Sequence, residues 1–124
     1  MSELKETIKK VIDEEPVALF MKGTPAFVMC GNSQRALEAL RSVGAPVTAV
    51  DVLPDPRIRQ ELSGLSGWPT IPQVFIGGEL VGGADIAEEL VASGELREKL
   101  ETKLGSGFAT GEETVVDVLA TSDV

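Results

Sequence analysis

Apolar residues recur at helical spacing in two stretches of the first half of the chain, and an unbroken apolar run separates them. Positions 4, 8, 11 and 12 would lie on one face of a helix over residues 2–13, with Ser2 as its cap. The run over residues 17–21 has the length of a buried strand. After Cys30, positions 36, 37, 40 and 43 would form the buried face of a second helix, which Gly44 ends.

The second half of the chain contains three further strand patterns. One strand is predicted over residues 47–50, and two more, over 73–76 and 79–81, are joined by the hairpin signal Gly77-Gly78. Asp55 before Pro56 is typical of a helix start, and this helix is predicted to end near residue 64. One further helix is predicted to begin at Asp85, as its cap, and another is predicted over residues 95–104.

The resulting order of elements is αβαβαββαα. Strands separated by a helix are expected to be parallel, and the late hairpin adds antiparallel strands. We therefore predict an α/β domain over residues 1–104, in which helices flank both faces of a four-stranded mixed sheet. From residue 105 the chain is polar and linker-like, so we expect residues 105–124 to form a flexible C-terminal tail. The alternative is that the apolar segment 115–119 docks as an edge strand or a short helix.

Composition and charge exclude several classes of function. The chain has 124 residues, the size of one domain, and 20 acidic against 11 basic residues give a net charge of −9. This charge disfavours binding to nucleic acid or to an anionic membrane surface. No apolar run is long enough to span a bilayer, and the first residues carry no signal-type segment, so we expect a cytoplasmic protein.

The counts of histidine and cysteine restrict the chemistry further. Histidine is absent, which removes histidine general bases, Ser-His-Asp and Cys-His arrangements, and any metal site that needs histidine. The single cysteine, Cys30, excludes an internal disulfide, a Cys-x-x-Cys pair and a cysteine-only metal site within one chain. Any sulfur or metal chemistry must therefore use ligands from outside the chain.

Cys30 stands at the predicted start of a helix, after a loop with glycine and proline. Free N–H groups and the positive end of the helix dipole favour a thiolate there, and Lys22 could add positive charge. The thiolate is the form of cysteine that acts as a nucleophile and as a metal ligand. A lone cysteine can also be only a small buried hydrophobic residue, but the polar neighbours Asn32 and Ser33 favour the reactive interpretation.

Two other segments carry weaker signals. If the bond before Pro72 is cis, the backbone of Ile71 is free to pair with an extended peptide, whereas a trans proline is the commoner case. The segment Gly82-Gly83-Ala84-Asp85 would place N–H groups at a helix start, where they could receive a carboxylate. Asp85 could instead be only a cap.

Four motifs together resemble the monothiol glutaredoxins, with matching order and spacing over about residues 3–104. They are Lys22-Gly23-Thr24-Pro25, then Met29-Cys30-Gly31 with Ser33, then Trp68-Pro69-Thr70-Ile71-Pro72-Gln73, and Gly82-Gly83 with Asp85. The resemblance implies a thioredoxin-like fold, which agrees with the predicted order of elements. One departure is Asn32, which stands where the family signature C-G-F-S has phenylalanine, and another is Ala84, at a position that is often a second cysteine.

The resemblance implies that the protein binds glutathione. Cys30 would supply the active thiolate, and Lys22 and Arg59 would hold the glycine carboxylate of the tripeptide. The groove and the site for its γ-glutamyl end would be formed by Thr70, Ile71, Pro72, Gly83, Ala84 and Asp85. Within this set, Ile71 would pair its backbone with the tripeptide beside a cis-proline, and the Asp85 carboxylate would bind the amino group.

The resemblance also implies a [2Fe–2S] cluster shared between two protomers, with one ligand from each Cys30 and one from each glutathione. The first hypothesis is thus an iron–sulfur carrier: a monomer without its cluster, a cluster-bridged homodimer with it, and a donor to iron–sulfur acceptor or assembly proteins. The second is a weak glutathione-dependent thiol–disulfide oxidoreductase that removes glutathione from protein thiols through Cys30. The third is a redox-inactive adaptor that binds a partner through its acidic surface or its tail.

Overall fold

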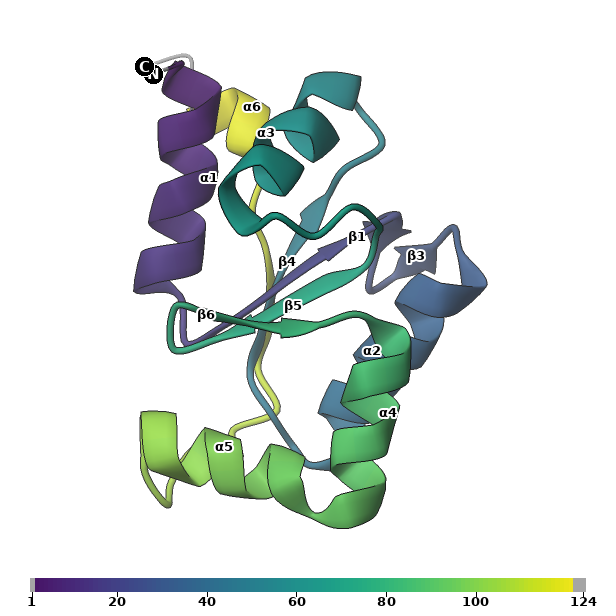
Figure 1. Cartoon of the computed structure of the whole chain (residues 1–124), viewed down its shortest axis with the longest axis vertical. Coiled ribbons are helices and arrows are strands. Elements are labelled where there is room, and N and C mark those ends of the chain that lie inside the picture. Colours follow the sequence, from purple (N-terminus) through teal and green to yellow (C-terminus); the bar gives the residue numbers. More distant parts are fainter. Residues whose placement is uncertain (1, 122–124) are drawn as a thin grey trace.

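The strand at the centre of the sheet is the most apolar one in the sequence. β1, Val17–Met21, is buried along its whole length, as a strand covered on both faces must be. It pairs in parallel with β4, Val47–Asp51, and antiparallel with β5, Gln73–Ile76, and β5 pairs antiparallel with β6, Glu79–Gly82. The computed structural model describes residues 2–121 (Figure 1).

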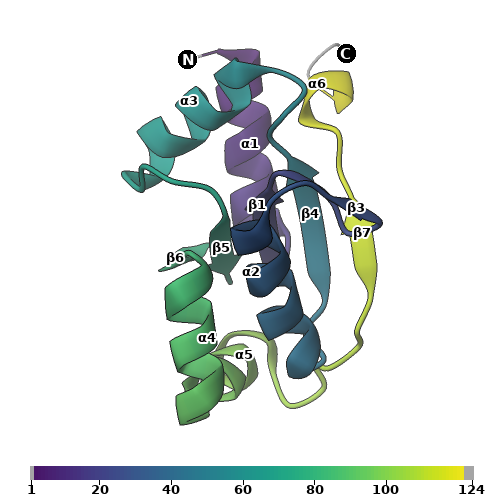
Figure 2. The same cartoon turned by 90° about the vertical axis from the view of Figure 1, so that its right-hand side faces the viewer.

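Alternate residues of β1 belong to two separate cores, one on each face of the sheet. On one face, Leu19 packs with α2, Gly31–Ser42, α4, Ala84–Ser93, and α5, Glu95–Leu104. On the other, Phe20 packs with α1, Glu3–Glu14, and α3, Pro56–Ser66. The two views show this arrangement, with the sheet between the two groups of helices (Figures 1 and 2).

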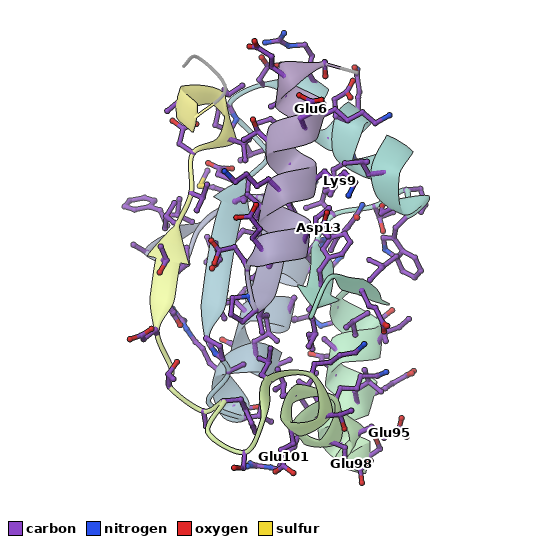
Figure 3. The ribbon with its side chains drawn as sticks, turned by 90° about the vertical axis from the view of Figure 1, so that its left-hand side faces the viewer. Glu6, Lys9, Asp13, Glu95, Glu98 and Glu101 are labelled. Carbon is purple, nitrogen blue, oxygen red and sulfur yellow. The ribbon has the colours of Figure 1, made fainter. Side chains whose placement is uncertain are left out.

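The caps expected from the sequence begin two of these helices. Ser2 Oγ accepts a hydrogen bond of 3.0 Å from the Lys5 N–H at the start of α1. Asp55 Oδ1 accepts one of 2.9 Å from the Arg57 N–H at the start of α3, where Pro56 is the first helical residue. Both predictions are confirmed. The outer faces of α1 and α5 carry charged side chains that point away from the sheet (Figure 3).

The segment after α5 differs from the expectation of a flexible tail. β7, Glu113–Val115, pairs in parallel with β4, so the sheet has five strands in the order β6-β5-β1-β4-β7, where four were predicted. The short helix α6, Val118–Thr121, then packs beside α1 (Figure 2). The alternative prediction was that this segment docks as an edge strand or as a short helix, and in the structure it forms one of each.

Two buried apolar side chains explain why this segment is ordered. Phe108 is 5% exposed in the core beneath α2 and α5, and Val118 is 1% exposed in the core beneath α1 and α3. Arg41 adds a pair of hydrogen bonds to the Glu113 carboxylate, of 2.7 and 2.8 Å. Composition did not reveal these anchors, because they are single residues separated by polar positions.

A small second sheet, not predicted from the sequence, lies between β1 and α2. It consists of β2, Gly23–Thr24, and β3, Phe27–Val28, which pair antiparallel. This hairpin brings the chain from the end of β1 to Cys30. Among residues 2–121 no helix is long and apolar enough to cross a membrane.

Candidate functional site

Cys30 is the N-cap residue of α2, with an extended backbone (φ −152°, ψ 134°) and a partly exposed side chain. The backbone N–H of Ser33, at the start of α2, favours the thiolate and has the largest effect in lowering the pKa of the thiol. Partial burial has the next largest effect and raises this pKa, whereas the Asn32 N–H, the positive charge of Lys22 and the Ser33 hydroxyl lower it further, each with a smaller effect. The expected helix-start environment is therefore present, and Cys30 is not sealed in the core.

Ser33 connects the start of α2 to the end of β1. Its side chain is fully buried, and Oγ accepts a hydrogen bond of 3.0 Å from the Lys22 N–H. The Lys22 carbonyl in turn accepts a bond of 3.0 Å from the Met29 N–H. These bonds hold the backbone of Lys22 next to the residues that flank Cys30.

A second set of contacts fixes the turn between Lys22 and Cys30. Asp51 Oδ1, at the end of β4, accepts bonds of 2.9 Å from the N–H groups of Gly23 and Leu53. Gly23 has φ +93°, and a Cβ there would lie 2.2 Å from the Phe27 carbonyl oxygen, so only glycine fits. Sequence analysis identified the glycine as part of a motif but gave no role to Asp51.

The segment between α3 and β5 approaches the site from another side of the molecule. The Ile71–Pro72 peptide bond is cis, as the family resemblance implies, and the commoner trans form is not the one adopted. Gln73 is fully buried, and its Nε2 donates to the carbonyls of Trp68, at 2.9 Å, and Thr70, at 3.2 Å. The amide therefore fixes the shape of the loop that precedes β5.

The start of α4 has free N–H groups but not the predicted cap. Gly83 is the N-cap residue, and no side chain caps the helix. The prediction that Asp85 caps α4 is wrong, because Asp85 lies inside the first turn and points away to an ion pair with Arg35. The uncapped N–H groups and the dipole make this helix start favourable for an anion.

These segments enclose a groove of about 440 Å³. It is lined by Asn32, Arg35, Trp68, Thr70, Ile71, Pro72, Gly83, Ala84, Asp85 and Ile86. Six of the residues singled out from the sequence are thus brought together, from Thr70 to Pro72 and from Gly83 to Asp85. Cys30, Lys22 and Arg59 lie outside this lining, and the Arg59 guanidinium donates to the Pro69 carbonyl at 3.3 Å.

Sequence analysis gave no role to the positively charged residue of the groove, Arg35. Its guanidinium donates to Glu88, to Asp85 Oδ1 at 2.7 Å and to Asn32 Oδ1 at 2.9 Å. Hydrogen bonds to Glu88, and then to Asp85, raise the pKa of Arg35, and the same hydrogen bonding from Arg35 lowers the pKa of Glu88. The only signal in the sequence was that Asn32 and Arg35 are three apart on one helix, which makes them neighbours.

Two exposed apolar side chains stand on the approach to Cys30. Phe27 is 76% exposed on β3, and Met29 is 64% exposed directly before the cysteine. Cysteine, histidine and acidic residues form no group of three or more suited to a metal ion within residues 2–121.

A mixed sheet with helices on both faces, a cysteine at the start of the helix after the first strand, and a cis-proline before a late hairpin define a thioredoxin-like fold. The glutaredoxin family profile matches residues 17–81. The chain belongs to the glutaredoxin family, and among its relatives are monothiol glutaredoxins.

Named relatives agree with this assignment. Identity is 43% over 104 residues with the chloroplastic monothiol glutaredoxin-S14 of Arabidopsis thaliana, covering 84% of this chain but only 60% of that relative. Glutaredoxin 4 of Pasteurella multocida is 48% identical over 95 residues, covering 77% of this chain and 87% of that protein. These matches confirm the family that the four motifs predicted.

Solved structures give the same result for the fold. The reduced apo form of poplar GrxS14 has a TM-score of 0.73 and 46% identity, covering 83% of this chain and 94% of that chain. A buckwheat glutaredoxin–glutathione complex has a TM-score of 0.69 at 25% identity, covering 81% and 92%. The predicted thioredoxin-like α/β fold is confirmed.

Proposed function

We propose that the groove binds glutathione with its sulfur next to Cys30. The backbone of Ile71 supports this assignment, because neither its N–H nor its carbonyl has a hydrogen-bond partner among residues 2–121. An extended peptide could pair with both groups, as a strand pairs with a sheet edge. Thr70 and Pro72 would form the walls of the groove on either side of this contact.

The two ends of the tripeptide would meet different groups. We assign the γ-glutamyl end to Gly83, Ala84 and Asp85, because the uncapped start of α4 favours a carboxylate and the Asp85 carboxylate favours an ammonium. Lys22 and Arg59, beyond the groove lining, would hold the glycine carboxylate. These local positive groups would offset the net charge of −9 that otherwise opposes an anionic ligand.

We further propose that the protein carries a [2Fe–2S] cluster as cargo between two protomers and passes it to iron–sulfur acceptor or assembly proteins. The observation that supports this most directly is the single, partly exposed Cys30, whose environment lowers the pKa of its thiol. Such clusters are held by four thiolates. One Cys30 and one glutathione from each half of a dimer would supply them, which fits a chain with no other cysteine or histidine.

Anaerobic reconstitution with iron, sulfide and glutathione tests this function. We expect visible absorbance of a cluster and a shift from monomer to dimer in size-exclusion chromatography. Both signals should require glutathione and should be absent in Cys30→Ser. Wild-type protein that shows neither absorbance nor dimer under these conditions would contradict cluster carriage.

Ser33 supports a second activity, the removal of glutathione from protein thiols. The Cys30 thiolate would attack the mixed disulfide at the glutathione sulfur and release the protein thiolate, leaving glutathione on Cys30. Ser33, near Cys30, has a hydroxyl and no thiol with which to attack this disulfide. A second glutathione thiolate would therefore attack it, forming oxidised glutathione and regenerating Cys30. The protein thiol is thereby reduced at the expense of one free glutathione, and both glutathione units leave as one molecule of oxidised glutathione.

A deglutathionylation assay separates this activity from cluster carriage. We expect release of glutathione from a model protein that is first order in added glutathione and depends on Cys30. The matched variant is Cys30→Ser, which keeps the shape of the site. Equal rates for wild type and Cys30→Ser would exclude the enzymatic role, and would not affect the outcome of the reconstitution.

A further inference from the structure

Arg35 is held firmly at one wall of the groove by three side chains from two helices. Asn32 is on the preceding turn of α2, and Asp85 and Glu88 are on α4. A guanidinium has five N–H donors. Nε and Nη2 use three of them on the two carboxylates, and Nη1 uses one on Asn32. The remaining Nη1 N–H has no hydrogen-bond partner among residues 2–121.

Arg35 and Asp85 place a positive and a negative group side by side in the groove lining. Asp85 uses only Oδ1 for Arg35, its Oδ2 has no partner among the described residues, and its side chain is 82% exposed. The Arg35 side chain is 39% exposed. Both partners therefore keep hydrogen-bonding capacity for a ligand, and both line the same groove.

Such a pair is complementary to the head of an α-amino acid, which carries an ammonium and a carboxylate on the same carbon. The ammonium would meet the carboxylate of Asp85, and the carboxylate would meet the guanidinium of Arg35. Hydrogen bonds between ionised partners are the strong ones, and guanidinium is well suited to carboxylate. Of the two ends of glutathione, only the γ-glutamyl end has this head.

We propose that Arg35 determines the specificity of this groove by binding the γ-glutamyl α-carboxylate of glutathione, beside the N–H groups at the start of α4. The inference rests on the proposed binding of glutathione and adds a ligand contact to it. Asn32 acts as a positioning residue, because its Oδ1 holds Nη1, the atom that carries the unpaired N–H. The polar residue at this position thus serves Arg35, which an aromatic side chain would not do.

Binding of two ligands to full-length variants tests the proposal. The first ligand is S-methylglutathione, which cannot form a disulfide, and the second is its analogue with hydrogen in place of the γ-glutamyl α-carboxylate. Fluorescence of Trp68 reports binding, since it is the single tryptophan and lines the groove. Isothermal titration calorimetry provides the second measurement.

We expect Arg35→Gln to weaken binding of S-methylglutathione by about tenfold or more, because a charge-assisted bond is lost. The analogue should bind wild type and Arg35→Gln with equal affinity. Asn32→Ala should give a smaller loss, again for S-methylglutathione only. The control is Arg41→Gln on the same helix, whose partner Glu113 lies outside the groove, and it should bind both ligands like wild type.

The outcomes are distinct. Unchanged or tighter binding of S-methylglutathione by Arg35→Gln would overturn the proposal, and so would an equal loss for both ligands. Circular dichroism and thermal unfolding would show whether a variant is folded. Arg35→Lys keeps the charge but not the forked donors of the guanidinium, so its affinity for S-methylglutathione should lie between those of wild type and Arg35→Gln. Wild-type protein that binds neither ligand would reject the proposed function and this inference together, whereas the former results reject the inference alone.

Discussion

At the scale of single residues, the properties of Cys30 come mainly from backbone groups. The N–H groups of Ser33 and Asn32 meet the sulfur because Cys30 is the N-cap residue of α2, and these groups survive most side-chain substitutions. The Ser33 hydroxyl is different, because it lowers the pKa of the thiol and also accepts a hydrogen bond from the Lys22 N–H. The same hydroxyl therefore affects both the reactivity of the thiol and the stability of the surrounding loop.

Alkylation of Cys30 by iodoacetamide should reveal its lowered pKa. The rate should rise with pH with a midpoint below pH 9.0, the ordinary pKa of this thiol, because only the thiolate reacts. Ser33→Ala should move the midpoint to higher pH and cost about 1–3 kcal/mol of unfolding free energy, since the buried Lys22 N–H loses its acceptor. A midpoint at or above that of a free cysteine would show that the helix start does not activate the thiol.

The same shift predicts how the stability of the fold depends on pH. Because the pKa of Cys30 is lower in the folded chain than in the unfolded one, ionisation of the thiol stabilises the fold above the unfolded value. This contribution decreases as the pH falls and is lost once the pH passes through the lowered pKa. Cys30→Ser, which does not ionise, is the reference for that comparison.

The residues of the site that could be predicted from the sequence are those with a local signal. Cys30, Gly83 and the cis-Pro72 belong to short motifs whose geometry depends on adjacent residues. Arg35 and Asp85 are 50 positions apart and meet only because α2 packs against α4. Nothing in the local pattern around Asp85 distinguishes a cap from an ion-pair partner, which is why the predicted cap was wrong.

At the scale of elements, the C-terminal segment completes the sheet. β7 has every residue exposed, so it adds little core, and its order depends on the anchors on either side of it. Phe108 and Val118 supply apolar burial, and the ion pair from Arg41 to Glu113 fixes the register of β7 against β4. The matches to known relatives cover 77% to 84% of the chain in the cases above.

Two valines in this segment allow a matched test of its contribution. Val118→Ala should lower the unfolding free energy by about 2 kcal/mol, because the side chain is 1% exposed and its removal leaves a cavity beneath α1 and α3. Val115→Ala is the control, since Val115 is 54% exposed and its loss should change stability little. Urea unfolding measures both, and equal stability of the two variants would show that α6 does not contribute to the fold.

At the scale of the whole molecule, periodicity and run length predicted the order of the main elements, but not the extent of the sheet. The four predicted strands and five predicted helices are present because each has a strong local pattern, such as the buried run of β1. β7 has no such pattern, and it exists because β4 presents a free edge and the anchors bring the segment to it. Tertiary context decides elements of this kind.

Because α6 packs against α1, the last described helix lies beside the first, as Figure 1 shows. Leu119 and Ser2 lie on the same surface depression. Chain ends that are close in space permit circular permutation. A short linker could join residue 121 to residue 2, with new ends opened in the exposed loop 105–107. In that order of synthesis, β7, which pairs with the edge of β4, would leave the ribosome before both β1 and β4.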